Sequence, residues 1–240
     1  MLKEEFSEKI KEYMNKINIE ISDKQIEKFF DYMNLLLEWN EKINLTAITE
    51  PEDIILKHFV DCATILKYIK DEDKIIDIGT GAGFPGIPLK ILNEKLDITL
   101  IDSLNKRINF LNEIINKLDL KNIVAIHARA EELARNKEYR EKFDIATSRA
   151  VANLSTLSEY MLPFVKKDGM VISMKGSNIE EEVKNAKKAI KILGGEIEKI
   201  DNLNLANTNN IRNIITIKKV VKTPKEFPRK AGKPSKEPIC

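Results

Sequence analysis

The stretch from Lys74 to Gly86 constrains the fold more than any other part of the sequence. It reads Lys-Ile-Ile-Asp-Ile-Gly-Thr-Gly-Ala-Gly-Phe-Pro-Gly, so a short apolar run is followed by four glycines within eight residues, in a chain that has only nine. Glycine is favoured where φ is positive or where a ligand comes close to the backbone. The pattern therefore predicts a buried strand, an open turn and a helix, which together present backbone N–H groups to a nucleotide-like ligand.

Strand-like and helix-like segments alternate along the rest of the chain. We expect five strand–helix units, with strands near residues 75–78, 98–101, 123–126, 143–147 and 170–174. This alternation predicts a parallel sheet with helices on both faces. Two further strands, near 196–200 and 211–220, have no helix between them and should be antiparallel neighbours. The predicted fold is α/β, with a doubly wound, mostly parallel, Rossmann-like sheet of seven strands.

The chain divides into three predicted segments. Residues 1–70 form an N-terminal helical extension, in which apolar residues recur at helical spacing and Ser22 and Gln25 form a capping box. Residues 71–221 form the sheet-containing domain. Residues 222–240 hold half of the chain's eight prolines. That composition predicts an extended arm without a core of its own.

Composition excludes several classes of protein. No run of 18 apolar residues occurs, and the first residues mix acids and bases, so neither a transmembrane helix nor a signal peptide is expected. Cys62 and Cys240 stand far apart, which argues against a disulfide framework and a cysteine metal site. The sequence therefore predicts a cytoplasmic protein with no membrane association and no metal.

Two cofactors compete for the glycine loop. Residues 81–86 match the Gly-x-Gly-x-x-Gly pattern of NAD-binding turns, which is a weak signal alone. The acid Asp77, followed by Gly79, Gly81 and Gly83 at alternate positions, resembles the S-adenosylmethionine loop of class I methyltransferases. The expected antiparallel pair at the end of the sheet also favours that fold. An NAD-dependent oxidoreductase, and an RNA-binding module with a degenerate loop, remain as alternatives.

Acidic residues flank this loop on two strands. Asp102 ends the second strand, where a carboxylate can accept hydrogen bonds from both ribose hydroxyls of either cofactor. The alternative is that Asp77 only caps the glycine turn and that Asp102 only caps the following helix, for which Ser103 is a second candidate. Two such acids beside clustered glycines favour the binding interpretation.

Sequence blocks across nearly the whole chain identify a family. The chain resembles the bacterial small-subunit rRNA methyltransferase G family, also called glucose-inhibited division protein B. The blocks are Asn44–Ile48, His58–Asp61, Asp77–Pro88, Ile101–Ser103, Arg129–Glu131, Thr147–Val151, Lys175–Gly176 and Pro228–Pro234.

The resemblance implies methylation of a guanine N7 in 16S rRNA, with S-adenosylmethionine as donor and 16S rRNA or a small-subunit precursor as partner. It places Gly79 and Phe84 at the cofactor, Ala130 and Glu131 at its adenine end, and Arg149 beside the transferred methyl group. With the loop and the second strand included, the expected cofactor residues are Asp77, Gly79, Gly81, Gly83, Phe84, Asp102, Ser103, Ala130, Glu131 and Arg149.

The fourth strand is expected to supply the catalytic contact. It is followed by Arg149 in place of the Asn/Asp-Pro-Pro-aromatic turn of enzymes that methylate exocyclic amines. Guanine N7 has an in-plane lone pair and no proton, so positioning is required and a general base is not. We expect Arg149 to donate to guanine O6 or to phosphate, although an ion pair with Glu131 or another acid is the alternative. His58 and His127 are interpreted as ordinary hydrogen-bonded imidazoles, His58 with Asp61 as a partner.

The C-terminal arm is strongly basic. From Lys218 onward there are eight basic residues and two acidic ones, in a chain whose net charge is only +2. Either the arm is a solvated tail or it binds phosphate. With an rRNA substrate implied, the expected RNA contacts are Arg149, Lys175, Lys222, Lys225, Arg229, Lys230 and Lys233. Removal of the arm is then expected to weaken RNA binding but not cofactor binding, and the protein is expected to be a monomer.

Overall fold

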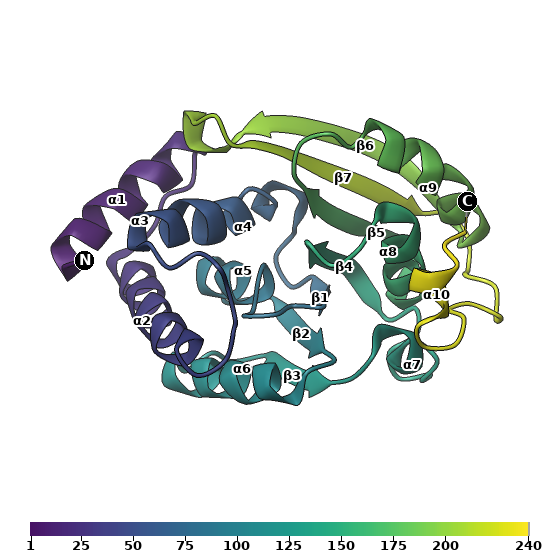
Figure 1. The fold of residues 1–240 in the computed structure, drawn as a ribbon, viewed down its shortest axis with the longest axis horizontal. Coiled ribbons are helices and arrows are strands. Elements are labelled where there is room, and N and C mark those ends of the chain that lie inside the picture. The colour runs from purple at the N-terminus through teal and green to yellow at the C-terminus, as the bar shows by residue number, and fades with distance from the viewer. Residues whose placement is uncertain (240) are drawn as a thin grey trace.

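A computed structural model describes residues 1–239, in which seven strands form one sheet (Figure 1). The strands are β1 Lys74–Ile78, β2 Asp97–Asp102, β3 Ile123–His127, β4 Phe143–Arg149, β5 Val165–Lys175, β6 Gly195–Asn204 and β7 Ile211–Lys219. Their order is β3-β2-β1-β4-β5-β7-β6. Strands β1 to β5 are parallel, while β7 runs antiparallel to both β5 and β6. The predicted seven-stranded, mostly parallel sheet and its antiparallel end are therefore confirmed.

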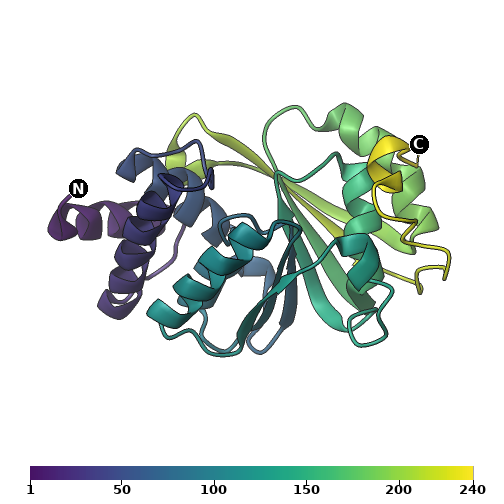
Figure 2. The ribbon, with the colours of Figure 1, turned by 60° about the horizontal axis from the view of Figure 1, so that its bottom comes forward.

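Helices cover both faces of the sheet (Figures 1 and 2). The α-helices are α1 Lys3–Lys16, α2 Asp23–Asn40, α3 Pro51–Ile54, α4 Asp61–Ala63, α5 Gly86–Leu92, α6 Asn105–Lys117, α7 Ala130–Leu133, α8 Leu154–Met161, α9 Glu180–Ile192 and α10 Lys233–Lys236; a π-helix, Ile55–Val60, joins α3 to α4. Buried side chains of α1–α6 share one hydrophobic cluster, and those of α7–α9 share another. The two clusters lie on opposite faces of the sheet.

Strand β1 shows why a continuous apolar run suits the centre of such a sheet. Ile75 belongs to the cluster beneath the N-terminal helices, whereas Ile76 and Ile78 belong to the cluster on the other face. Successive side chains of a strand point to opposite faces. Because helices cover both faces, every position of the strand must be apolar or internally paired.

The N-terminal helices form an integral layer of the molecule. Ser22 caps α2, and the capping box with Gln25 that the sequence predicts is present. Phe6, Ile10 and Met14 on α1 are fully buried in the same cluster as residues of α5 and β2. Because this core is shared, residues 1–70 pack against the sheet and have no hydrophobic core of their own. The segment boundaries near residues 70 and 221 stay predictions.

Two local expectations differ from the structure. Helix α6 begins at Asn105, and Ser103 makes no capping bond; Oδ1 of Asp102 accepts from the backbone N of Leu104 at 2.9 Å instead. Strand β5 begins at Val165, ahead of the apolar run that predicts it. Cys240 lies outside the described residues. Within residues 1–239 no helix is long and apolar enough to cross a membrane.

Candidate active site

The glycine loop between β1 and α5 has a backbone that is open on one side. Gly79, Gly81 and Gly83 all have positive φ, a conformation that residues with a Cβ adopt at a cost. A Cβ on Gly81 would meet no atom within 4 Å, so its bare backbone faces open space. Gly83, by contrast, packs closely against Ile87 and Tyr32. The loop thus leaves its backbone open at Gly81, whereas Gly79 packs closely against Val151, and Gly83 against Ile87 and Tyr32.

Asp77 lies beneath this loop and holds its shape. The side chain has no exposed surface, and its Oδ2 accepts from Gly86 N at 2.9 Å and from Thr80 Oγ1 at 2.6 Å. Burial raises the pKa of the Asp77 carboxyl to about 6, against the effect of these two donors. Asp77 lines neither of the cavities described next. Its observed contacts are those of a cap on the turn.

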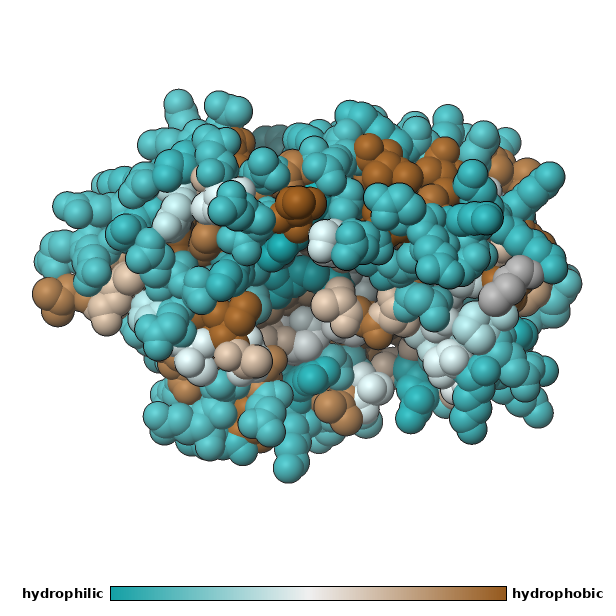
Figure 3. Space-filling view, turned by 45° about the horizontal axis from the view of Figure 1, so that its top comes forward, coloured by the Kyte–Doolittle hydropathy of each residue, from teal (hydrophilic) through white to brown (hydrophobic). Residues whose placement is uncertain are grey.

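Two cavities meet at Gly79, along the carboxyl ends of β1, β2 and β4. The larger, of about 460 Å³, is lined by the glycine loop, the 45–61 segment and the ends of β4, β5 and β7. The smaller, of about 160 Å³, lies between β2, the start of α7 and the C-terminal arm. Figure 3 shows one face of the molecule hollowed near its middle. Ligands of open α/β sheets bind at the carboxyl ends of the strands.

Besides Gly79, the smaller cavity gathers four of the residues expected at the cofactor, namely Asp102, Ser103, Ala130 and Glu131. They come from two different crossovers and are far apart in sequence. Asp102 is 3% exposed, and its Oδ2 accepts from Gly81 N at 3.0 Å and from Arg107 Nη1 at 3.2 Å. Its carboxylate therefore joins the glycine loop to the cavity wall.

Arg149 projects into the larger cavity from the end of β4. Its Nη1 donates to the Lys57 carbonyl at 2.9 Å and to Asp61 Oδ2 at 3.0 Å, and its Nη2 bonds to His58 Nδ1 at 2.9 Å. The guanidinium also lies over the Phe84 ring, 4.8 Å from its centroid. The ion-pair alternative is thus realised with Asp61 and not with Glu131. These three bonds use three of the five N–H donors of an arginine.

His58 has a defined protonation state. Burial, followed by the charge of Arg149, lowers the pKa of His58 to about 3, so the ring is neutral at pH 7. An arginine cannot accept a hydrogen bond, so Nδ1 is the acceptor and the proton lies on Nε2. Nε2 then donates to Thr46 Oγ1 at 2.8 Å. The expected bond from His58 to Asp61 is replaced by the bonds to Arg149 and Thr46.

Asp61 links two arginines at the wall of the larger cavity. Oδ2 pairs with Arg149, while Oδ1 pairs with Nε of Arg212 at 2.9 Å. Asp61 is 3% exposed. Sequence reasoning missed Arg212, because a single arginine in a strand gives no signal. Thr46 lies in a family block without an assigned role, and Asp61 was expected only as a partner of His58.

The expected RNA contacts are divided between two regions. Lys175 lines the larger cavity, with Nζ 2.6 Å from both Glu182 Oε1 and the Ala152 carbonyl. On the arm, Arg229 forms a bidentate pair with the buried Glu159. Its guanidinium is therefore not free for phosphate. Exposed side chains remain at Lys222, Lys225, Lys230 and Lys233.

No group of three or more potential metal ligands occurs within residues 1–239. His127 is on the surface, with Nε2 3.0 Å from the Ser103 carbonyl. Cys62 is buried, and burial raises the pKa of its thiol. Neither His127 nor Cys62 lines the two cavities that meet at Gly79.

Comparison with known proteins assigns the family. The family model for rRNA small subunit methyltransferase G matches residues 25–215. A protein of that name from Clostridium botulinum (strain Alaska E43) is 55% identical over 225 residues, covering 93% of this chain and 94% of that one. Another, from Acetivibrio thermocellus, is 56% identical over 222 residues, covering 92% and 91%.

Solved structures show the same fold at much lower identity. NSun6 from Pyrococcus horikoshii with SFG matches with a TM-score of 0.55 at 18% identity, covering 68% of this chain and 52% of that one. M. jannaschii TYW2 in complex with AdoMet matches with a TM-score of 0.52 at 15% identity, covering 65% and 72%. The fold is that of class I methyltransferases. The chain belongs to the rRNA small subunit methyltransferase G family.

Proposed function

We propose that this methyltransferase transfers a methyl group from S-adenosylmethionine to N7 of a guanine in 16S rRNA. The observation that carries the proposal is the junction at Gly79, where the cavity that holds Asp102 and Glu131 opens beside the one that holds Arg149. A nucleoside donor in the smaller cavity would direct its reactive end toward the larger. A pyridine dinucleotide enzyme, the earlier alternative, is not supported by the family.

The residues present fit the proposed donor. The open backbone at Gly81 leaves room for a ligand against the loop, and Asp102 offers a buried carboxylate at the end of β2. Ala130 and Glu131 would border the adenine, while Gly79 and Phe84 would border the methionine portion. S-adenosylmethionine supplies an electrophilic methyl group on a positively charged sulfur.

The chain's own residues need only position the base and exclude water. Guanine N7 carries a lone pair and no proton, so the chain would need no general base for N7 to accept the methyl group. A neutral His58 is consistent with such a site, because it cannot supply a proton at pH 7. Orientation of this kind can account for a large part of a rate enhancement.

Arg149 is the proposed positioning residue for guanine. Its bonds to Lys57, Asp61 and His58 fix the plane of the guanidinium. The remaining N–H groups are then available to O6 of guanine or to a phosphate. The ion pair and the functional role are compatible, because Asp61 orients the group that would contact the substrate.

The charge of the larger cavity suits RNA. Its lining residues include five cationic side chains, each also paired with a carboxylate, and a single acid, Asp61. The cationic ones are Lys57, Arg107, Arg149, Lys175 and Arg212. Phosphate contacts of this kind give affinity and register without sequence readout. We propose that the four exposed arm lysines add further contacts, that the substrate is 16S rRNA or a small-subunit precursor, and that the protein acts as a cytoplasmic monomer.

The test is methylation of 16S rRNA and of 30S subunits from cells that lack this gene. Purified protein with labelled donor should modify one guanine, and borohydride followed by aniline should cleave the RNA there, because N7 methylation labilises the base. Methylation without cleavage would place the methyl group on another atom.

An Arg149→Lys variant tests the role of the guanidinium. A lysine cannot reproduce the planar fork, so the single-turnover methylation rate should fall roughly 100-fold. A rate within threefold of the parent would remove Arg149 from the proposed mechanism.

A further inference from the structure

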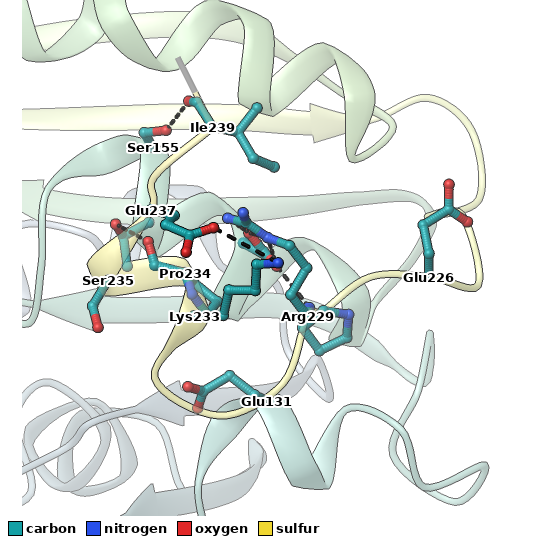
Figure 4. A network of polar contacts seen from close by, with 12 residues as sticks. Glu131, Ser155, Glu226, Arg229, Lys233, Pro234, Ser235, Glu237 and Ile239 are labelled. Atoms are coloured by element: carbon teal, nitrogen blue, oxygen red, sulfur yellow. Dashed lines mark hydrogen bonds and ion pairs between the residues drawn. The ribbon is translucent and has the colours of Figure 1, made fainter.

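The C-terminal arm lies beside α7 and α8 (Figure 1), and Figure 4 shows its residues close to Glu131 and Ser155. Two arginines from the loop after α7 donate hydrogen bonds to backbone carbonyls of the arm. Arg140 donates to the Phe227 carbonyl at 2.8 Å and to the Thr223 carbonyl at 2.9 Å. Arg135 donates to the Glu226 carbonyl at 3.3 Å. The arm is therefore a docked segment with backbone partners, and not a solvated tail.

A buried ion pair fixes the middle of the arm. Glu159 on α8 is 1% exposed, and it accepts from Arg229 through the backbone N at 2.7 Å, through Nη2 at 2.7 Å and through Nε at 3.0 Å. Removing one partner of a buried pair is costly, because the other charge stays buried without compensation. Arg229 is thus the anchor that keeps this part of the arm against α8.

Beyond Arg229 the arm runs along the wall of the smaller cavity. Gly232 N donates to Glu131 Oε1 at 2.8 Å, and Gly232 and Ser235 line the 160 Å³ cavity together with Asp102 and Glu131. Thr156 Oγ1 donates to the Pro234 carbonyl at 3.0 Å and so fixes the start of α10. The carboxylate expected at the adenine end of the cofactor is therefore held by the arm's backbone.

We propose that the C-terminal arm forms one wall of the nucleoside end of the cofactor site, and that methyl-donor binding requires the arm to be docked. The inference rests on the proposed function, since it takes the smaller cavity as the nucleoside end. Arg229 is a positioning residue, which acts through Gly232 and Glu131. Under this proposal removal of the arm should weaken cofactor binding, whereas the sequence alone led us to expect that it would leave cofactor binding intact.

Docking and cofactor binding must then be linked in both directions. A cofactor that binds only when the arm is docked stabilises the docked state. Release of the arm then lowers the affinity for the cofactor by the same free energy. Docking of the arm would also fix the positions of Lys230 and Lys233, which lie close to Gly232 in sequence. Cofactor binding would therefore affect where these two lysines can contact RNA.

The test is calorimetric titration of S-adenosylhomocysteine into the full-length chain and two variants. Arg229→Ala releases the anchor, and its dissociation constant should rise at least tenfold. Lys236→Ala removes an exposed charge from the same arm and should change the constant less than twofold. In methylation assays Arg229→Ala should raise the KM for the donor and leave kcat nearly unchanged.

The outcomes separate this inference from the proposed function. Tight binding by the parent chain and equal binding by Arg229→Ala would overturn the role of the arm and leave the function standing. A parent chain that binds no S-adenosylhomocysteine would overturn both. A second measurement does not depend on the folding of Arg229→Ala, because it uses the parent chain alone. Trypsin cleavage after Lys230 should slow at least fivefold when S-adenosylhomocysteine is added. Cleavage at an unchanged rate would contradict docking-linked binding.

Discussion

Asp61 is the residue on which the geometry of the larger cavity depends most. Its carboxylate is 3% exposed and orients both Arg149 and Arg212. Asp61→Ala would leave two guanidinium groups without their anion in a largely buried place. We expect the free energy of unfolding to fall by about 3 to 5 kcal/mol in urea denaturation.

A control for this change lies on the neighbouring helix. Asp53 pairs with Lys57 four residues away, at the surface. Because exposed pairs of this kind contribute about 0.5 kcal/mol or less, Asp53→Ala should have little effect. If Asp61→Ala and Asp53→Ala lowered the free energy of unfolding equally, the pairing of Asp61 with Arg149 and Arg212 would not be what stabilises this part of the chain.

The neutral state of His58 predicts a pH dependence of stability. Its pKa is about 3 in the folded chain, below the ordinary value of about 6.5 that applies when unfolded. The unfolded state therefore binds more protons below pH 6.5, so this contribution to stability is present above that pH and is lost as pH falls toward 3. Between pH 7 and pH 5 the loss is about 2 kcal/mol.

The comparison with His58→Gln isolates this effect. Asp77, whose pKa is raised to about 6, acts in the opposite direction and is common to both proteins. The parent should lose about 2 kcal/mol more than the variant between pH 7 and pH 5. In NMR the ring signals of His58 should not titrate between pH 5 and 8. A midpoint near the ordinary value would disprove the assignment of the buried neutral tautomer.

At the scale of the element, the start of α5 depends on the absence of a side chain at Gly86. A Cβ there would lie 2.3 Å from Leu100 Cδ2 and 3.0 Å from Asp77 Oδ2. Leu100 is fully buried, so its side chain would have to shift within a packed core. Gly86→Ala should therefore destabilise the protein by about 1 to 3 kcal/mol in urea denaturation.

Gly176→Ala is the matched control, because a Cβ at Gly176 meets no atom within 4 Å. It should change the free energy of unfolding by less than about 0.5 kcal/mol. An equal effect of the two substitutions would show that close packing at Gly86 is not what the loop requires.

The elements whose residues interact locally could be predicted from the sequence. The glycine loop, the capping box at Ser22 and the antiparallel final strands all follow from short-range patterns. The residues expected at the cofactor from the loop, β2 and α7 line one cavity, because parallel strands end at one edge of the sheet. Ser103 failed as a cap because Asp102 already binds the backbone N of Leu104.

Long-range pairs could not be predicted in this way. Arg212 reaches Asp61 across 151 positions, and Arg229 reaches Glu159 across 70. Each pair joins an element of one part of the chain to a partner that only the assembled fold brings near. The basic composition of the arm suggested RNA contacts, whereas the structure uses its arginine to dock the arm.

At the scale of the whole molecule, the N-terminal helices and the sheet share one core. Phe6 on α1 is fully buried, and its ring lies 5.3 Å from that of Phe30. Phe6→Ala should lower the free energy of unfolding by about 3 to 5 kcal/mol. Because the core is shared, the chain should still melt in a single transition at a lower temperature.

Leu2→Ala provides the control, since Leu2 is 74% exposed. Its effect should be within about 0.5 kcal/mol of zero. Two separate calorimetric transitions, with only the first shifted by Phe6→Ala, would show that residues 1–70 fold as a unit apart from the sheet.

Hydrogen–deuterium exchange with and without S-adenosylhomocysteine tests the location of the cofactor site most directly. The account predicts slower amide exchange in residues 79–84, 102–104 and 129–131, together with the arm around Gly232, and no change in α1. Protection that is absent from the glycine loop, or that appears only elsewhere in the chain, would contradict it.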